Sequence, residues 1–191
     1  MNHLSRRVAI TALLVALTVA TGAGAADGPL WALLKAGGQV VLVRHAITTP
    51  GVGDPPGFRP DDCATQRNLT DEGRGDASRL GEAFWARRIP IARVLSSPWC
   101  RCLETGRLAF GAAEPWWPLG NLFGRPENRA DQVRELQSLA GERQAVGDQN
   151  QVAAGSTIAA LTGINPAPAE MVVLTPLGGG RFTVAGRFRG A

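Results

Sequence analysis

The sequence predicts an α/β protein of three layers, α-β-α, in which helices cover both faces of a mainly parallel central sheet. Two short runs, at residues 39–43 and 91–95, are rich in consecutive apolar residues rather than alternating, as in strands buried on both faces. Each run is followed, after a short joint, by a longer segment with apolar residues at helical spacing. This β-α-β-α order is typical of a parallel sheet.

Composition indicates one folded unit. The chain has 191 residues, of which 45% are hydrophobic and 19% charged, which is enough to bury a single core. No internal repeat is visible. The formal net charge of +4 includes Arg6 and Arg7, which lie in a removable leader, so the remaining chain is only slightly basic and nucleic-acid binding is not indicated.

The first 26 residues have the pattern of a signal peptide, and residues 27–191 form the predicted domain. Arg6 and Arg7 precede an unbroken apolar run at residues 8–20, and small residues suited to cleavage follow. The alternative is a membrane anchor, but the run is shorter than the roughly 20 residues that span a bilayer. We therefore expect a periplasmic or secreted protein without stable membrane insertion after cleavage.

Cysteine usage fits an oxidising compartment. Of Cys63, Cys100 and Cys102, the last two are separated by one residue and would need strained geometry to join each other. Cys63 is therefore expected to pair with either Cys100 or Cys102. No metal site is expected, because His45 is the only histidine outside the leader.

The remaining segments predict the following order of elements. These are a helix at 30–36, the strand at 39–43, an irregular loop at 49–66, a helix from an N-cap at Thr70 to about Arg88, the strand at 91–95, a helix at 100–110, an aromatic loop at 114–123, a helix at 127–140, and a hairpin pairing 171–174 with 182–188. Residues 141–152 should supply another buried strand, yet they offer almost nothing apolar to bury.

The chemistry concentrates at the end of the first strand. Arg44 and His45 follow it directly, and catalytic residues of parallel sheets lie beyond the carboxyl ends of strands. A neutral imidazole can attack phosphorus, and an arginine can hold the phosphoryl oxygens. The alternative is a strand-end histidine satisfied by hydrogen bonds beside a solvated arginine. Arg101, which follows the second strand at the same edge, favours the catalytic interpretation.

Two strings carry a family resemblance. Val43-Arg44-His45-Ala46 and Ser96-Ser97-Pro98-Trp99-Cys100-Arg101 resemble the motifs of the histidine phosphatase superfamily, in its small secreted bacterial branch. The resemblance implies a phosphoglycerate mutase-like fold and a mechanism without metal or organic cofactor. It also implies that His45 is the phosphate-accepting nucleophile, that Arg44 and Arg101 bind the phosphoryl group, and that Thr48 lies on the phosphate loop. Arg67 is left outside the catalytic set, since a solvated loop arginine is an equal interpretation.

Two positions depart from the family pattern. Asn121 stands where the proton-donating carboxylic acid is expected, and an amide cannot donate a proton at neutral pH, so Glu114 is a possible substitute. Ala154 stands where a second histidine is expected, before Gly155-Ser156-Thr157-Ile158. Loss of such a preorganised donor lowers rates by about 100-fold to 1,000-fold. The window 144–154 reflects either degeneration or a local sequence error.

The sequence therefore predicts an exported phosphomonoester hydrolase that forms a phosphohistidine on His45 and is impaired by the change at Ala154. Its substrate would be a phosphorylated small molecule or phosphoprotein. The alternative is a catalytically inactive relative that binds phosphate or a phosphorylated ligand. A phosphoglycerate mutase is disfavoured by the short chain, the missing glutamate and the export signal. Substrate identity and oligomeric state have no readable pattern.

Overall fold

A computed structural model describes residues 27–120, 129–143, 150–155 and 157–189, and for residues 150–154 it describes the backbone. The signal-peptide segment and Asn121 lie outside these residues. The elements in chain order are helix α1 (Gly28–Ala36), strand β1 (Val40–Val43), a 3-10 turn (Cys63–Thr65), α2 (Asp71–Arg87), β2 (Ile91–Ser96), α3 (Cys100–Phe110), β3 (Glu114–Pro115), a 3-10 turn (Trp117–Leu119), α4 (Arg129–Gly141), β4 (Asn150–Ala154), α5 (Ile158–Thr162), β5 (Glu170–Gly178) and β6 (Arg181–Arg189).

The described strands form one sheet in the order β3-β2-β4-β1-β5-β6. The pairs β2/β3, β2/β4 and β1/β4 are parallel, whereas β1/β5 and β5/β6 are antiparallel. The sheet is therefore mixed rather than mainly parallel, because the closing hairpin β5/β6 adds two antiparallel pairings next to β1. The expected parallel order holds for the half that carries the predicted site.

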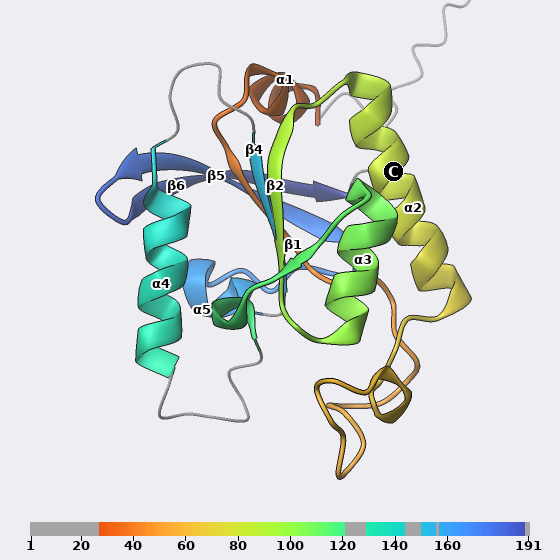
Figure 1. Cartoon of the computed structure of the whole chain (residues 1–191). Coiled ribbons are helices and arrows are strands. Elements are labelled where there is room, and N and C mark those ends of the chain that lie inside the picture. Colours follow the sequence, from red (N-terminus) through yellow and green to blue (C-terminus); the bar gives the residue numbers. More distant parts are fainter. Residues whose placement is uncertain (1–26, 121–128, 144–149, 156, 190–191) are drawn as a thin grey trace, which may run out of the picture.

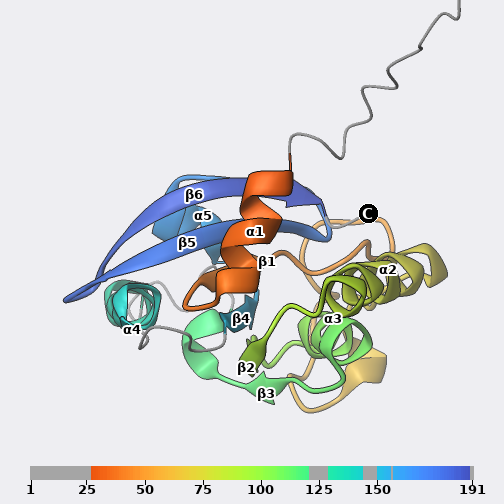
Figure 2. The same cartoon turned by 90° about the horizontal axis from the view of Figure 1, so that it is seen from above.

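Helices cover both faces of this sheet. On one face α1, α2 and α3 pack against Val41 and Val43, and on the other face α4 and α5 pack against Val40 and Leu42. Figure 1 shows α2 and α3 on one side of the sheet and α4 on the other, and Figure 2 shows α1 crossing over the hairpin. Because alternate residues of a strand face opposite sides, an all-apolar β1 must be covered twice, as predicted.

Several local predictions are confirmed. The Thr70 side chain caps α2 by accepting a hydrogen bond from the backbone N–H of Gly73 at 3.0 Å. A Cβ at Gly73 would lie 2.0 Å from the carbonyl oxygen of Ile47, so glycine lets the chain after β1 cross close over this helix. Helix α3 has the predicted bounds. The expectation that β2 is buried along its whole length is wrong, because its early residues Ala92 and Arg93 are exposed.

A strand does form at the end of the polar stretch in which the sequence offered almost nothing apolar to bury. β4 spans Asn150–Ala154 and lies between β2 and β1, paired in parallel with both. Its polar members, Asn150 and Gln151, begin the strand, and the apolar Val152, Ala153 and Ala154 end it. Backbone hydrogen bonding on both sides offsets a weak side-chain pattern, since strand formation depends strongly on context.

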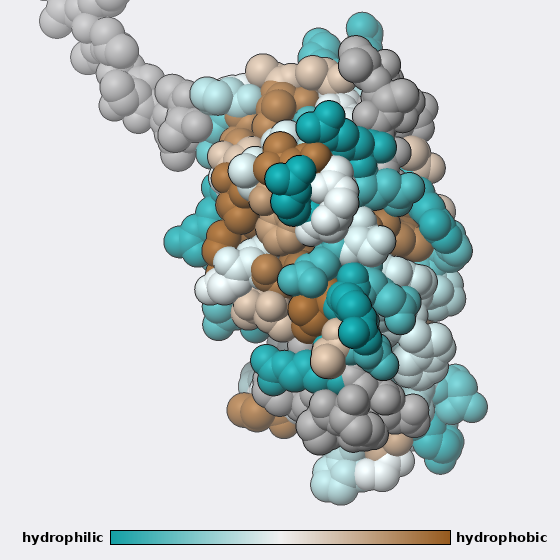
Figure 3. Space-filling view, turned by 90° about the vertical axis from the view of Figure 1, so that its left-hand side faces the viewer, coloured by the Kyte–Doolittle hydropathy of each residue, from teal (hydrophilic) through white to brown (hydrophobic). Residues whose placement is uncertain are grey.

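On the face shown in Figure 3, hydrophobic and hydrophilic residues are interspersed. Among the described residues, none of the helices combines the length and the apolar character needed to cross a bilayer.

Candidate functional site

The carboxyl ends of three neighbouring strands define the site. Ala154, the last residue of β4, is in register with Val43 on one side and with Ser96 on the other. The backbone N–H of Gly155 donates to the carbonyl of Val43 at 3.0 Å and holds the two strand ends together. Position 154 therefore lies between the strand end that leads into His45 and the strand end that leads into α3.

A cavity of about 680 Å³ opens at this edge. It brings together Arg44, His45 and Arg101, as the sequence predicted, and adds Arg67. The described residues that line it are Arg44, His45, Gly51, Val52, Gly53, Arg67, Arg101, Gly155, Ile158, Ala159, Asn165 and Pro166. The cavity therefore gathers three guanidinium groups around one imidazole.

His45 is held as a neutral base. Its side chain is buried, and Nδ1 lies 2.9 Å from the carbonyl oxygen of Ala46, which can only accept a hydrogen bond. Nδ1 therefore carries the proton, and Nε2 keeps its lone pair. The pKa of His45 is lowered from 6.5 to about 4: burial is the largest cause, the Ala46 hydrogen bond opposes it, and the charges of Arg101, Arg44 and Arg67 act in the same direction as burial. The imidazole is thus unprotonated at neutral pH, as a nucleophile must be.

The backbone after His45 is fixed to α3. The N–H of Ala46 donates to the Thr105 hydroxyl at 3.1 Å, and that hydroxyl donates to the carbonyl of Arg101 at 2.7 Å. Thr105 is fully buried. This connection sets the end of β1 against the first turn of α3, so His45 and Arg101 are positioned by the same contact.

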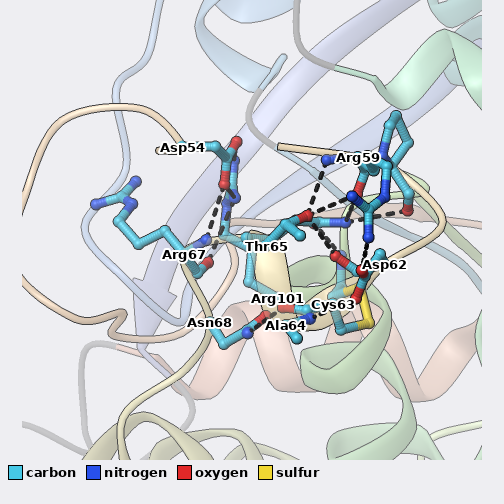
Figure 4. Close-up of a disulfide and its surroundings, with 12 residues drawn as sticks. Asp54, Arg59, Asp62, Cys63, Ala64, Thr65, Arg67, Asn68 and Arg101 are labelled. Atoms are coloured by element: carbon cyan, nitrogen blue, oxygen red, sulfur yellow. Dashed lines mark hydrogen bonds and ion pairs between the residues drawn. A yellow bond between two sulfur atoms is a disulfide. The ribbon is translucent and has the colours of Figure 1, made fainter. Parts of the chain in front are cut away.

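Arg101 is tied to an aspartate that the sequence analysis did not single out. Its Nη1 donates to Asp54 Oδ1 at 2.6 Å and its Nη2 to Asp54 Oδ2 at 3.3 Å (Figure 4). The two side chains are 5% and 3% exposed, so this is a buried ion pair. Burial raises the pKa of Asp54, but hydrogen bonds from Arg101 and the Arg67 backbone outweigh it and hold the pKa below 3.8. Asp54 is a carboxylate and not a proton donor at neutral pH.

Arg67 also belongs to the cavity. Its Nη1 donates to the carbonyl of Gly51 at 2.7 Å, and its backbone N–H donates to Asp54. Burial lowers the pKa of Arg67, and repulsion from Arg101 and Arg44 adds to this, against the attraction of Asp54. Within the described residues, the Nε atoms of Arg67 and Arg101 are buried without a hydrogen-bond partner. Two such donors beside one cavity suit an oxyanion.

Arg44 is anchored by its Nη1, which donates to the carbonyl of Pro166 at 2.6 Å. The guanidinium keeps further N–H groups for a ligand.

A disulfide joins the loop to the helix. Cys63 and Cys100 are bonded, which decides between the two predicted pairings, and Cys102 is free and buried. Beside the bridge, the Gln66 side chain accepts a hydrogen bond from the backbone N–H of Cys100 at 3.1 Å and caps the start of α3. The loop that carries Asp54 and Arg67 is therefore fastened one residue away from Arg101.

The other predicted residues lie elsewhere. Thr48 forms a backbone bridge with Leu69 and is not among the described residues that line the cavity. Glu114 pairs with Arg93 through two hydrogen bonds of 2.9 and 2.6 Å, which lower the pKa of that exposed carboxyl. A carboxylate engaged in this way, outside the cavity, is poorly suited to donate a proton. Among the described residues, no three His, Cys, Asp or Glu side chains are grouped to hold a metal ion.

The sequence could have indicated Arg67 only weakly. It follows a glycine- and proline-rich loop without periodicity, so its burial depends on contacts with distant residues. Asp54 gave no signal, because its partner Arg101 is 47 positions away.

Solved structures share this fold. The protein histidine phosphatase SixA complexed with tungstate has a TM-score of 0.55 at 18% identity, covering 80% of this chain and 97% of that chain. The mycobacterial glucosyl-3-phosphoglycerate phosphatase with inorganic phosphate has a TM-score of 0.52 at 16% identity, and the match covers 81% of this chain and 97% of that chain. The alpha-ribazole phosphatase of Shigella flexneri has a TM-score of 0.53 at 14% identity, and the match covers 76% of this chain and 94% of that chain. No family model matches the chain, and no curated protein matches it. The chain thus shares the fold of these phosphatases, as the sequence resemblance implied.

Proposed function

We propose that this chain is an exported phosphomonoester hydrolase that uses His45 as its nucleophile. The observation that carries the proposal is the neutral, oriented imidazole of His45 inside a cavity with three arginines. In the first step Nε2 attacks phosphorus, the ester P–O bond breaks, and the leaving oxygen takes up a proton from solvent water. Water then attacks the phosphorus and gives up a proton to solvent, the P–N bond breaks and returns its electron pair to Nε2, and inorganic phosphate is released.

The arginines support charge on the transferred group. Arg44, Arg67 and Arg101 are close enough to His45 to lower its pKa, so their positive charges also act on a phosphoryl group bound to Nε2. The unpartnered Nε donors of Arg67 and Arg101 suit phosphoryl oxygens.

Export is part of the same proposal. The leader pattern at residues 1–26 and the bond between Cys63 and Cys100 both favour a periplasmic or secreted protein. One structural neighbour is named as a protein histidine phosphatase and another as a glucosyl-3-phosphoglycerate phosphatase. A phosphorylated small molecule or phosphoprotein is therefore a reasonable substrate class for this fold.

The test is to trap the intermediate. Purified protein is incubated with a labelled generic phosphomonoester, quenched in alkali, and analysed for acid-labile phosphate. We expect label on the wild type and none on His45→Ala. Absence of both turnover and acid-labile phosphate in the wild type would overturn the enzyme proposal.

The second candidate is a catalytically silent phosphate-binding protein, which is favoured by the alanine at position 154, between the ends of β1 and β2. The variant Ala154→His separates the two. If the enzyme is impaired by the missing donor, this variant raises turnover. The control Ala92→His, at an exposed position in the first half of β2, leaves turnover unchanged. Phosphate binding without turnover in all three chains would support the silent relative.

A further inference from the structure

The carboxylate of Asp54 accepts hydrogen bonds from three residues. Arg101 donates to both of its oxygens, through Nη1 and Nη2. The backbone N–H of Arg67 donates to Oδ1 at 3.0 Å, and the indole N–H of Trp99 donates to Oδ2 at 2.9 Å. A carboxylate has about four sites for such donors, so these contacts leave Asp54 no capacity for a ligand. Any part that Asp54 takes in the site is therefore exerted through the residues that it binds.

The guanidinium of Arg101 has about five N–H groups in one plane. One N–H from each Nη points to Asp54, and the second N–H of Nη1 points to the carbonyl of Arg67 at 3.4 Å. Within the described part of the chain this leaves Nε–H, which is buried without a hydrogen-bond partner, and the second N–H of Nη2. In a planar guanidinium these two groups are parallel and lie on the same edge.

This free edge of Arg101 suits a phosphoryl group, because two parallel N–H groups match two of its oxygens. Arg101 lines the cavity together with His45. Of the three arginine charges that lower the pKa of His45, that of Arg101 has the largest effect. An arginine side chain has several rotatable bonds, so its free edge is fixed in direction only if the other edge is held.

Resting on the proposed function, we propose that Asp54 is a positioning residue, which binds one edge of the Arg101 guanidinium and so reserves the edge with Nε–H for the phosphoryl oxygens. The bridge between Cys63 and Cys100 fastens the loop of Asp54 to the start of α3, where Trp99 and Arg101 also lie (Figure 4). The alternative is an ion pair that only supports the fold, but a buried ion pair is weak evidence of net stabilisation.

Calorimetry with inorganic phosphate tests this without turnover, by comparing the wild type with Asp54→Asn. Removing a negative charge near the cavity tightens phosphate binding by itself, whereas losing the alignment of Arg101 weakens it. We expect the dissociation constant to rise about tenfold or more. Loss of folded protein lowers the measured stoichiometry and leaves the dissociation constant unchanged. Equal or tighter binding by Asp54→Asn would overturn the inference.

The matched control is Asp62→Asn, the same substitution in the same loop, at a carboxylate that pairs with Arg59 instead. It should leave the phosphate dissociation constant unchanged. The substitution Asp54→Asn is also made in Arg101→Gln, where it should no longer weaken phosphate binding, because the residue through which Asp54 acts is gone. A similar weakening in both backgrounds would mean that Asp54 supports only the loop, contrary to the proposal.

NMR of the wild-type guanidinium protons adds a measurement that needs no folded Asp54 variant. With Arg101 held on Asp54, its Nη protons should give separate signals, and phosphate should shift its Nε–H signal; the signals absent from Arg101→Gln identify them. Averaged Nη signals, or an Nε–H signal that phosphate leaves in place, would contradict the proposal. Both signatures without turnover would leave this inference standing, and only the hydrolase proposal would fail.

Discussion

Lowering the pH should destabilise the folded chain through His45, because its buried imidazole resists protonation. The pKa of this histidine is lowered to about 4, mainly by burial, and Arg101, Arg44 and Arg67 act in the same direction. The unfolded chain keeps the ordinary value of 6.5. Between these values the unfolded state binds a proton that the folded state does not. The contribution to stability is therefore complete above pH 6.5 and is lost as the pH falls toward 4.

The size of this loss follows from the two pKa values. Each tenfold difference in proton affinity corresponds to about 1.4 kcal/mol. Values of 6.5 and about 4 predict a loss of about 2 kcal/mol at pH 5 and about 3 kcal/mol at pH 4. His45 is 6% exposed, so screening by solvent removes little of this.

The assay is urea unfolding of the wild type and of His45→Asn at several pH values between 7.5 and 5, in buffers without phosphate. Asparagine has no proton to gain, and the carboxylates titrate in both chains, so they cancel in the difference between them. The free energy of unfolding of the wild type should fall relative to the variant by about 2 kcal/mol. A difference that stays constant over this range would refute the buried neutral histidine.

Two further predictions concern the contacts that support the site. Asp54→Asn should lower the free energy of unfolding by about 3 kcal/mol, because it leaves the buried Arg101 without its charge partner, whereas Glu114→Gln breaks an exposed pair and should change it little. Urea unfolding of both variants checks this, and equal losses would contradict it. Cys63→Ser should lower the free energy of unfolding by about 3 to 4 kcal/mol, since the bridge spans a sequence separation of 37. Cys102→Ala keeps the bridge, and its loss of unfolding free energy should be less than half as large. Similar losses for the two cysteine variants would argue against a stabilising bridge.

The parts of the fold that could be predicted from sequence are those with a strong local signal. β1 is an unbroken apolar run that ends in Arg44 and His45, and an all-apolar strand has few alternatives to burial on both faces. α2 begins at a threonine cap with acidic residues in its first turn. Both signals lie within a few residues of the element that they specify, so no knowledge of distant contacts is needed.

The features that could not be predicted depend on partners far away in the sequence. β4 is a central strand because β1 and β2 flank it, and its own residues at 150 and 151 are polar. Asp54 and Arg67 lie in or beside a loop whose course is set by the bridge to Cys100 and by the pairing with Arg101. Loop residues without periodicity acquire such contacts only in three dimensions, so sequence patterns do not reveal them.

The presence of Arg67 in the cavity also affects how much catalytic rate we expect the alanine at position 154 to cost. The sequence suggests a site with its nucleophile side complete and the other side empty. Arg67 adds a third cation to the cavity, and it and Arg101 each offer a buried Nε donor without a partner among the described residues. Under the proposed function, positive charge is therefore not what the site lacks, and the predicted effect of the alanine is the loss of one oriented donor. A preorganised donor contributes about 100-fold to 1,000-fold. We expect Ala154→His to raise kcat by a factor near the lower end of that range, and a gain well above 1,000-fold would show that the arginines do not compensate.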